Sequence, residues 1–223
     1  MLVGAVDLRS EPFDPCTLDL AVRHLSAGGL VVMPTETVYG FGCVLERKPL
    51  SQIQHLKGRE PDKPFLLLIP GVEAVPDLKW CTEALELAKV FWPGALTLVL
   101  EDPEEKFPQS VRNPLGGVAV RVSPHPLARA MLSALGVPIV STSANRPGGS
   151  PARSAEEARE ALEALGGGED LLILDGGLLD PSPPSTIVDF SGSEPMVRRA
   201  GAVPVDRIRC VLPEINDPNS FCV

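Results

Sequence analysis

Apolar and polar residues follow two different spacings along this chain, and together they predict a mixed α/β fold. Short runs rich in valine, isoleucine and leucine predict buried strands near residues 30–33, 64–70, 95–101, 118–123, 137–140, 171–174, 185–190 and 195–199. Apolar residues that recur every three or four positions predict helices near residues 15–27, 50–57, 82–91, 125–136 and 154–165. Several strands follow one another directly near the end of the chain, which predicts a sheet of mixed strand direction and not a strict βαβ repeat.

Two of the predicted helices begin with recognisable caps. Asp14 precedes Pro15, which is the order of an N-cap residue and a proline in the first turn. Ser154 and Glu157 have the spacing of a capping box. The glycine pair at 28–29 is expected to end the first helix.

The composition narrows the class of protein. The chain has 223 residues, 44% of them hydrophobic and 22% charged, with a net charge of −9. This length allows one large domain or two small ones. Because no linker divides the chain, we expect one domain over 1–223, with a core from about 18 to 208 and a loose tail at 213–223. The net negative charge argues against tight, non-specific binding of nucleic acid.

The cysteines and the apolar runs bear on the location of the protein. No two of the five cysteines have the spacing of a zinc knuckle or a redox pair, and the first residues do not resemble a signal peptide. No apolar run approaches the roughly 20 residues that span a bilayer. We therefore expect a cytoplasmic protein with reduced thiols and no membrane contact.

Residues 31–42, VVMPTETVYGFG, place hydrogen-bonding side chains directly after a predicted buried strand. Loops that follow the strands of open α/β sheets are common ligand sites. The hydroxyls of Thr35, Thr37 and Tyr39 are therefore candidates for binding a polar small molecule. The alternative is a capping turn, in which a threonine hydroxyl bonds nearby main-chain amides.

Residues 56–64, LKGREPDKP, hold three cations in a stretch interrupted by glycine and proline, namely Lys57, Arg59 and Lys63. In a loop these side chains are candidates for a polyphosphate site. The alternative is a solvated surface turn, because the spacing is not that of a Walker A loop.

Residues 140–145, VSTSAN, follow another apolar strand and offer polar side chains at Ser141, Thr142, Ser143 and Asn145. Hydroxyls and backbone amides in such a loop suit an anion. A serine nucleophile is the rival interpretation, but the G-x-S-x-G pattern is missing and no histidine is placed by the sequence as a base.

Three further polar residues lie in or beside predicted strands: Arg121 in VAVRVS, Ser185 in STIVDF and Arg199 in MVRR. Each of them either emerges on a solvent face or faces a ligand. Arg198 is expected to point to the opposite face of the strand from Arg199. The sequence contains no histidine, cysteine or carboxylate spacing typical of a metal site.

Taken in order, the segments PTETVYGFG, KGR, VAVRV, STSAN, STIVD and RRAG resemble the YrdC/Sua5 family over residues 18 to 208. The resemblance implies an open, twisted α/β sheet around a large concave pocket. It also implies the activity of a threonylcarbamoyl-AMP synthase. In that reaction bicarbonate and L-threonine form a carbamate, the carbamate attacks the α-phosphate of ATP, and pyrophosphate leaves.

The resemblance further implies that Mg²⁺ accompanies the ATP, with no protein ligand for it that the sequence identifies. Downstream proteins would transfer the threonylcarbamoyl group to adenosine 37 of tRNA, and a weak contact of this chain with tRNA is left open. By the family pattern, ATP would meet Lys57, Arg59, Lys63, Ser143, Asn145 and Arg199, with Lys57 and Arg59 as the catalytic candidates. Threonine would meet Thr35, Thr37, Tyr39, Arg121, Ser141 and Ser185. Arg121 suits the carboxylate of threonine.

The chain departs from the family pattern at three positions. Glu60 stands where proline usually follows the arginine of K-x-R, Leu68 stands where many long members have histidine, and Ser123 replaces the proline of VRVP. The extra C-terminal domain of longer Sua5 proteins is expected to be absent. The alternatives are a related carbamoyl-adenylate-forming enzyme with another acceptor, an RNA-binding module, and a subunit whose pocket is unused.

Overall fold

The computed structural model describes residues 6–9, 13–58, 63–167 and 171–218. In these residues ten strands form one sheet, in the order β1-β8-β2-β3-β7-β4-β6-β5-β9-β10. Their bounds are β1 (Val6–Asp7), β2 (Leu30–Pro34), β3 (Tyr39–Val44), β4 (Leu66–Leu68), β5 (Leu96–Glu101), β6 (Gly117–Arg121), β7 (Ile139–Ser143), β8 (Leu171–Asp175), β9 (Thr186–Asp189) and β10 (Met196–Arg199). The sheet contains parallel pairs, such as β2 with β8, and antiparallel pairs, such as β3 with β7, so the predicted mixed α/β class is confirmed.

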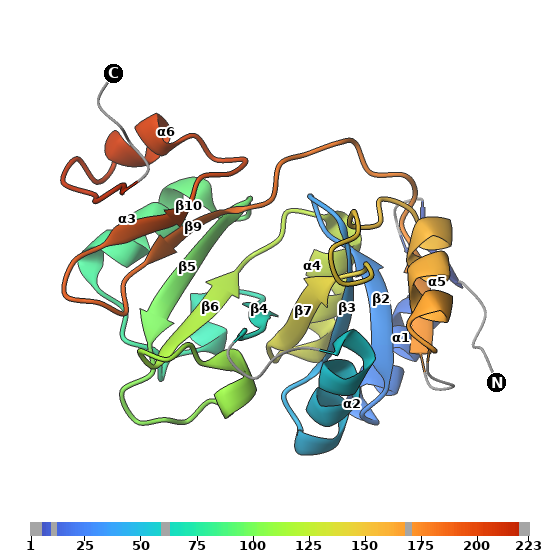
Figure 1. Cartoon of the computed structure of the whole chain (residues 1–223). Coiled ribbons are helices and arrows are strands. Elements are labelled where there is room, and N and C mark those ends of the chain that lie inside the picture. Colours follow the sequence, from blue (N-terminus) through green and yellow to red (C-terminus); the bar gives the residue numbers. More distant parts are fainter. Residues whose placement is uncertain (1–5, 10–12, 59–62, 168–170, 219–223) are drawn as a thin grey trace.

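Helices lie on both faces of this sheet (Figure 1). The α-helices are α1 (Pro15–Ser26), α2 (Arg47–Lys57), α3 (Thr82–Phe91), α4 (Pro126–Leu135), α5 (Ala155–Ala164) and α6 (Val205–Arg209). Two short 3-10 helices are η1 (Val72–Ala74) and η2 (Gln109–Val111). No helix among the described residues combines the length and the hydropathy needed to cross a bilayer.

The strand β2 is buried on both faces because successive side chains alternate between two hydrophobic clusters. Val31 and Met33 pack in the cluster that includes α1 and α4. Leu30 and Val32 pack in the cluster that includes α2 and α5. Period-two alternation places these pairs on opposite faces of the sheet, and a strand covered on both faces reads as a continuous apolar run.

The predicted helix caps are present. The side chain of Asp14 accepts a hydrogen bond from the Thr17 main-chain N–H at 3.0 Å. The hydroxyl of Ser154 accepts one from the Glu157 N–H at 3.1 Å. The carboxylate of Glu157 returns to the N–H of Arg153, at 2.7 Å, one residue earlier than in a standard capping box.

The strand β3 was not expected, because residues 35–42 were interpreted as a loop. It pairs antiparallel with β2, with Met33 opposite Gly40 and Val31 opposite Gly42. Glycine is unusual in strands, and it hid the alternation of Tyr39, Phe41 and Cys43, which enter the hydrophobic core on one face. The polar turn is therefore short and comprises residues 35–38.

The expectation of a loose tail from residue 213 is wrong for the described residues 213–218. Ile215 is 6% exposed and packs in the main core cluster. The N–H of Val197 donates to the carbonyl of Asn216 at 2.7 Å, which attaches this segment beside β10. Proline and polar residues suggested disorder, but one buried isoleucine and this backbone pairing hold the segment against the sheet.

Residues 176–185 connect β8 to β9 without regular structure, and we call them the cover segment. Figure 1 shows this segment passing over the top of the molecule, from the side of β8 to the side of β9. Its ends are attached to the body of the protein: the N–H of Leu179 bonds the carbonyl of Arg153, and the N–H of Ala202 bonds the carbonyl of Pro184.

Candidate functional site

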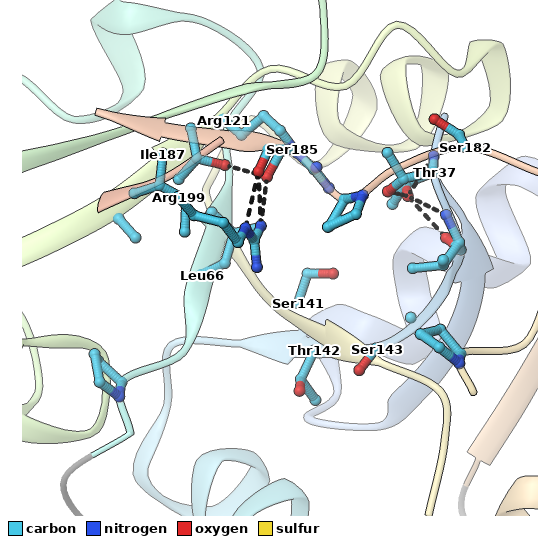
Figure 2. A pocket seen from close by; sticks show the side chains of 18 of the residues that line it. Thr37, Leu66, Arg121, Ser141, Thr142, Ser143, Ser182, Ser185, Ile187 and Arg199 are labelled. Carbon is cyan, nitrogen blue, oxygen red and sulfur yellow. Dashed lines mark hydrogen bonds between the residues drawn. The ribbon is translucent and has the colours of Figure 1, made fainter. Parts of the chain in front are cut away.

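A cavity of about 850 Å³ lies on the middle strands of the sheet. Its wall comes from the turn after β2, from strands β3 to β7, from β9 and β10, from the loop after β7, and from the cover segment. Figure 2 shows Arg121, Ser141, Ser185 and Arg199 around this space. Segments from most of the chain therefore meet at one site.

The turn after β2 supplies two hydroxyls to the cavity wall, those of Thr35 and Thr37. The Thr35 hydroxyl donates to the carbonyl of Val38 at 2.7 Å and lies 3.2 Å from the Thr37 hydroxyl. The main-chain N–H groups of Thr37 and Val38 both lie 3.3 Å from the Thr35 hydroxyl. Both the capping interpretation and the ligand-binding interpretation therefore apply to Thr35, because its hydroxyl closes the turn and the residue also lines the cavity.

Arg121 enters the cavity from the end of β6 and is only 4% exposed. Its Nη1 lies 3.0 Å from Oε1 of Glu36, and Oε2 of Glu36 accepts a hydrogen bond from the Ser123 hydroxyl at 2.6 Å. Burial lowers the pKa of Arg121 from its ordinary value, and the charge of Glu36 opposes that shift. The strand therefore buries a cation that a carboxylate partly compensates.

Arg199 enters from the end of β10 and is held by neutral oxygens. Its Nε and Nη2 donate to the carbonyl of Ser185 at 3.0 and 2.8 Å, and Nη2 also lies 3.2 Å from the Ser185 hydroxyl. That hydroxyl lies 2.8 Å from the hydroxyl of Thr97, which also lines the cavity. Burial and then the charge of Arg121 lower the pKa of Arg199, so the two guanidinium groups act on each other electrostatically.

Strand β7 supplies Ser141 and Ser143 to the wall. The hydroxyl of Ser143 donates to the side-chain oxygen of Asn145 at 2.7 Å. The ammonium of Lys57 donates to the carbonyls of Ser143 and Asn145 and to that same side-chain oxygen, at 2.9, 2.6 and 2.9 Å. The ammonium of Lys57 thus holds the loop after β7 in place without itself lining the cavity.

Gly40 of β3 faces the cavity opposite β7. A Cβ atom at this position would lie 2.9 Å from the hydroxyl oxygen of Ser141 and 3.1 Å from the carbonyl of Thr142. Since real Cβ atoms avoid the first of these distances, glycine keeps this part of the cavity open.

A second cavity of about 570 Å³ lies beside the first, and both are lined by Ser150, Pro151 and Arg153. Asn145 lines this second cavity, as do two carboxylates of α5, Glu157 and Glu160. The two cavities therefore adjoin at the loop after β7.

Tyr39 was expected among the threonine-binding residues, but the structure places its side chain elsewhere. It is fully buried in the main core, and it is not part of the cavity wall. Its hydroxyl donates to the carbonyl of Gly177 at 2.6 Å and accepts from the N–H of Gly176 at 3.1 Å. Because Gly40 faces the cavity, strand alternation turns Tyr39 to the opposite face, where it ties down the cover segment.

The other predicted residues divide into three groups. Seven line the main cavity: Thr35, Thr37, Arg121, Ser141, Ser143, Ser185 and Arg199. Asn145 lines the second cavity, whereas Lys57 and Lys63 line neither. Lys57 is 8% exposed and lies behind the loop after β7, and Lys63 is exposed beside Pro64 of the wall. Arg59 lies outside the described residues, as does Glu60.

The sequence analysis missed several residues of the site, and three of them bear on its charge and hydrogen bonding. Thr97 interrupts the apolar run of β5 in the way that Arg121 interrupts β6, and this was an available signal. Glu36 lies in the motif already noted, but its partner Arg121 is distant in sequence. Arg153 lies two residues after Pro151 and shows no pattern that distinguishes it from a surface arginine. The departure at Leu68 stands beside Arg121 in the sheet, but its side chain lines neither cavity and is fully buried in the core cluster that includes α1 and α4.

The arrangement suits an anionic ligand with several hydrogen-bonding groups. Arg121, Arg153 and Arg199 bring three positive charges to the main cavity, and Glu36 compensates that of Arg121. Around them stand neutral hydroxyls that are able to donate or to accept. Among the described residues no group of three histidine, cysteine, aspartate or glutamate side chains is placed to hold a metal ion.

Comparison with known proteins extends this picture. A family model described as Sua5_yciO_yrdC, Telomere recombination, matches residues 23–201. A Chromohalobacter salexigens protein named threonylcarbamoyl-AMP synthase is 37% identical over 181 residues, which cover 80% of this chain and 95% of that protein. The structure of Pyrococcus abyssi Sua5 complexed with L-threonine is similar with a TM-score of 0.87 and 32% identity, covering 96% of this chain and 62% of that one. Escherichia coli YciO is similar with a TM-score of 0.80 and 27% identity, covering 93% of this chain and 100% of that one.

Proposed function

Because this chain belongs to the Sua5/YciO/YrdC family, we propose that it is an enzyme that makes threonylcarbamoyl-AMP from L-threonine, bicarbonate and ATP. The observation that supports this most directly is the cavity in which Arg121, Arg199 and several hydroxyls converge. A related protein of similar fold has been solved with L-threonine, which suits a cavity of this chemistry.

The proposed reaction has two steps. The ammonium group of threonine and bicarbonate give a carbamate, one water molecule and one proton. A carbamate oxygen then forms a bond to the α-phosphorus of ATP, and the bond from that phosphorus to the leaving pyrophosphate breaks. The nucleophile of the second step is already an anion, so this step needs no general base. It needs alignment of the two reactants and stabilisation of the pyrophosphate charge.

We assign the threonine end of the cavity to the side chains nearest Arg121. The guanidinium of Arg121 would receive the carboxylate of threonine. The hydroxyls of the turn after β2, of β7 and of the start of β9 would bond its amino and hydroxyl groups, and they belong to Thr35, Thr37, Ser141 and Ser185.

We assign the nucleotide to the part of the main cavity that Ser143 lines and to the neighbouring second cavity, which Asn145 lines. Arg199 also lines the main cavity, where it contacts Ser185 of the threonine site. Arg199 would face phosphate oxygens as a charge-assisted donor. Arg59, which lies outside the described residues, and Lys63 are proposed to bind the phosphates. Lys57 would act through the loop that it holds, because its ammonium already donates to Ser143 and Asn145.

Magnesium would come with the nucleotide. It would neutralise phosphate charge, and its ligands would be phosphate oxygens and water, which is how Mg²⁺ is most often held in nucleotide sites.

We further propose that the product is handed to the proteins that transfer the threonylcarbamoyl group to adenosine in tRNA, and that this happens in the cytoplasm. A mixed carbamic–phosphoric anhydride is an activated acyl donor, so a transfer reaction must consume it.

The test is release of pyrophosphate from ATP by the purified protein, with and without L-threonine and bicarbonate. We expect release that requires both, together with a product that has the mass of threonylcarbamoyl-AMP. Release that needs bicarbonate but not threonine would indicate another acceptor. No release under any of these conditions would overturn the proposal and leave a binding function.

A further inference from the structure

Arg121 is contacted from two sides. One side of its guanidinium lies at the cavity, and Nη1 lies 3.0 Å from Oε1 of Glu36. Glu36 itself is not part of the cavity wall, so it reaches the guanidinium from outside the ligand space. A ligand and Glu36 can therefore contact Arg121 together.

Glu36 is in turn held in place. Its Oε2 accepts a hydrogen bond from the hydroxyl of Ser123 at 2.6 Å. Ser123 is fully buried, and its oxygen also accepts from the N–H of His125 at 3.2 Å, at the start of α4. The carboxylate is thus attached to the first turn of a helix, which fixes its position relative to the sheet.

The contact between Glu36 and Arg121 is an ion pair, and neither Oε1 of Glu36 nor Nε of Arg121 has an aligned hydrogen bond with a described residue. The pair therefore acts mainly through charge and leaves the Nε donor of Arg121 without an acceptor among the described residues. An unsatisfied buried donor is costly, so this geometry favours an additional acceptor.

The surrounding charges make this carboxylate necessary. Arg199 also lines the cavity, and the two oxygens of Ser185 that it contacts are neutral. The positive charge of Arg121 lowers the pKa of Arg199. Without Glu36, Arg121 would be a buried cation without a compensating charge beside a second cation, and its side chain would gain by moving away.

We propose that Glu36 is a positioning residue, which fixes the guanidinium of Arg121 so that its remaining N–H groups receive the carboxylate of the amino-acid substrate. This inference rests on the proposed function, because it takes the substrate to be an amino acid. It assigns recognition of the substrate carboxylate to a unit of three side chains, Glu36, Arg121 and Ser123.

The alternative, that Glu36 competes with the substrate, predicts the opposite change in threonine affinity. If Glu36 competed with the substrate for Arg121, its removal would tighten threonine binding. The placement of Glu36 outside the cavity predicts the reverse.

The experiment compares the wild-type protein with Glu36→Gln, and with Glu86→Gln as a control, since Glu86 is an exposed residue of α3. We expect Glu36→Gln to raise the KM for L-threonine by at least about tenfold, with the KM for ATP changed less than about twofold. L-Threonine should also raise the melting temperature of Glu36→Gln less than that of the wild type, a readout that does not depend on turnover.

A second comparison tests whether the effect passes through Arg121. The wild type should respond to L-threonine and not to L-threoninamide, which lacks the carboxylate, and Glu36→Gln should lose much of this preference. In the background of Arg121→Gln, adding Glu36→Gln should have little further effect on the KM for threonine. Independent, additive effects of the two substitutions would overturn the inference.

If Glu36→Gln does not fold, Ser123→Ala replaces it, since this change frees the carboxylate without altering either charge. A threonine KM that is unchanged or lowered, in Ser123→Ala or in a folded Glu36→Gln, overturns the inference. Failure of the wild type to use threonine would overturn the proposed function instead, so the two failures are distinguishable.

Discussion

Lys57 and Asn145 are joined by two hydrogen bonds across 88 positions of sequence: the lysine ammonium lies 2.6 Å from the main-chain carbonyl of Asn145 and 2.9 Å from its side-chain oxygen. A third bond reaches the carbonyl of Ser143 at 2.9 Å. The end of α2 is thereby attached to the loop after β7. A lysine that the sequence suggested for phosphate binding serves in this structure to shape the loop.

The first prediction follows from this contact. Lys57→Met should lower the free energy of unfolding by about 2–3 kcal/mol, because hydrogen bonds to a charged donor are lost and buried carbonyls are left unpaired. Pyrophosphate release should fall with it, since Ser143 and Asn145 lose their support. Urea denaturation measures the loss of stability, and the pyrophosphate-release assay measures the loss of activity.

The matched control is Lys89→Met, at an exposed lysine in the last turn of α3, which should leave both quantities close to wild type. A Lys57→Met protein of unchanged stability with no activity would contradict the supporting role. Lys57 would then be assigned to phosphate binding, as the sequence suggested.

The second prediction uses two neighbouring arginines of β10. Arg199 lines the cavity and bonds Ser185, whereas Arg198 pairs with Asp189 at 2.8 Å. Arg199→Ala should slow pyrophosphate release about 10- to 100-fold, the loss expected for one charge-assisted contact. Arg198→Ala should release pyrophosphate at close to the wild-type rate, since Arg198 lines neither cavity. Loss of its ion pair with the buried Asp189 should lower stability instead.

The assay of this pair is steady-state kinetics with ATP as the varied substrate. Equal losses of activity in Arg199→Ala and Arg198→Ala would mean that the end of β10 acts through its overall structure and not through a contact of Arg199. The assignment of Arg199 to the nucleotide would then be wrong.

The third prediction concerns Gly40. A Cβ at this position would lie 2.9 Å from the Ser141 hydroxyl oxygen, so Gly40→Ala should displace that side chain. We expect the KM for threonine to rise about tenfold or more, because small displacements of positioning groups are costly. Crowding of a packed site should also lower stability by about 1–3 kcal/mol.

Gly192→Ala is the control, because a Cβ there would meet only one atom, at 3.9 Å. Isothermal titration with L-threonine provides the direct measurement. Wild-type affinity in Gly40→Ala would show that the floor of the cavity tolerates a methyl group and that Ser141 does not contact threonine.

The sequence was sufficient for most elements, because their apolar spacing and their caps are local. It failed at β3, where Gly40 and Gly42 interrupt the pattern of a buried strand. That single failure also misplaced Tyr39, since the side of a strand that a residue occupies depends on the strand being recognised.

Most individual residues of the site could be predicted from the sequence, but their arrangement in space could not. Arg121 was correctly marked as a charge within an apolar strand, yet only the sheet order decides whether it faces solvent or a cavity. Its ion pair with Glu36 joins β6 to the turn after β2, and the strands β3, β7 and β4 separate them in the sheet. No local pattern encodes such a contact.

The fourth prediction concerns the titration of Tyr39, which is the one tyrosine of the sequence. Burial is the main cause that raises the pKa of its hydroxyl from about 10 to about 12. The unfolded chain releases this proton first as the pH rises through that window, so the folded state loses stability there. Phenolate absorbance should therefore rise near pH 10 in concentrated urea and only near pH 12, or on unfolding, in the native protein. Tyr39→Phe should abolish the signal, and a native midpoint near pH 10 would mean that the hydroxyl is not held beneath the cover segment.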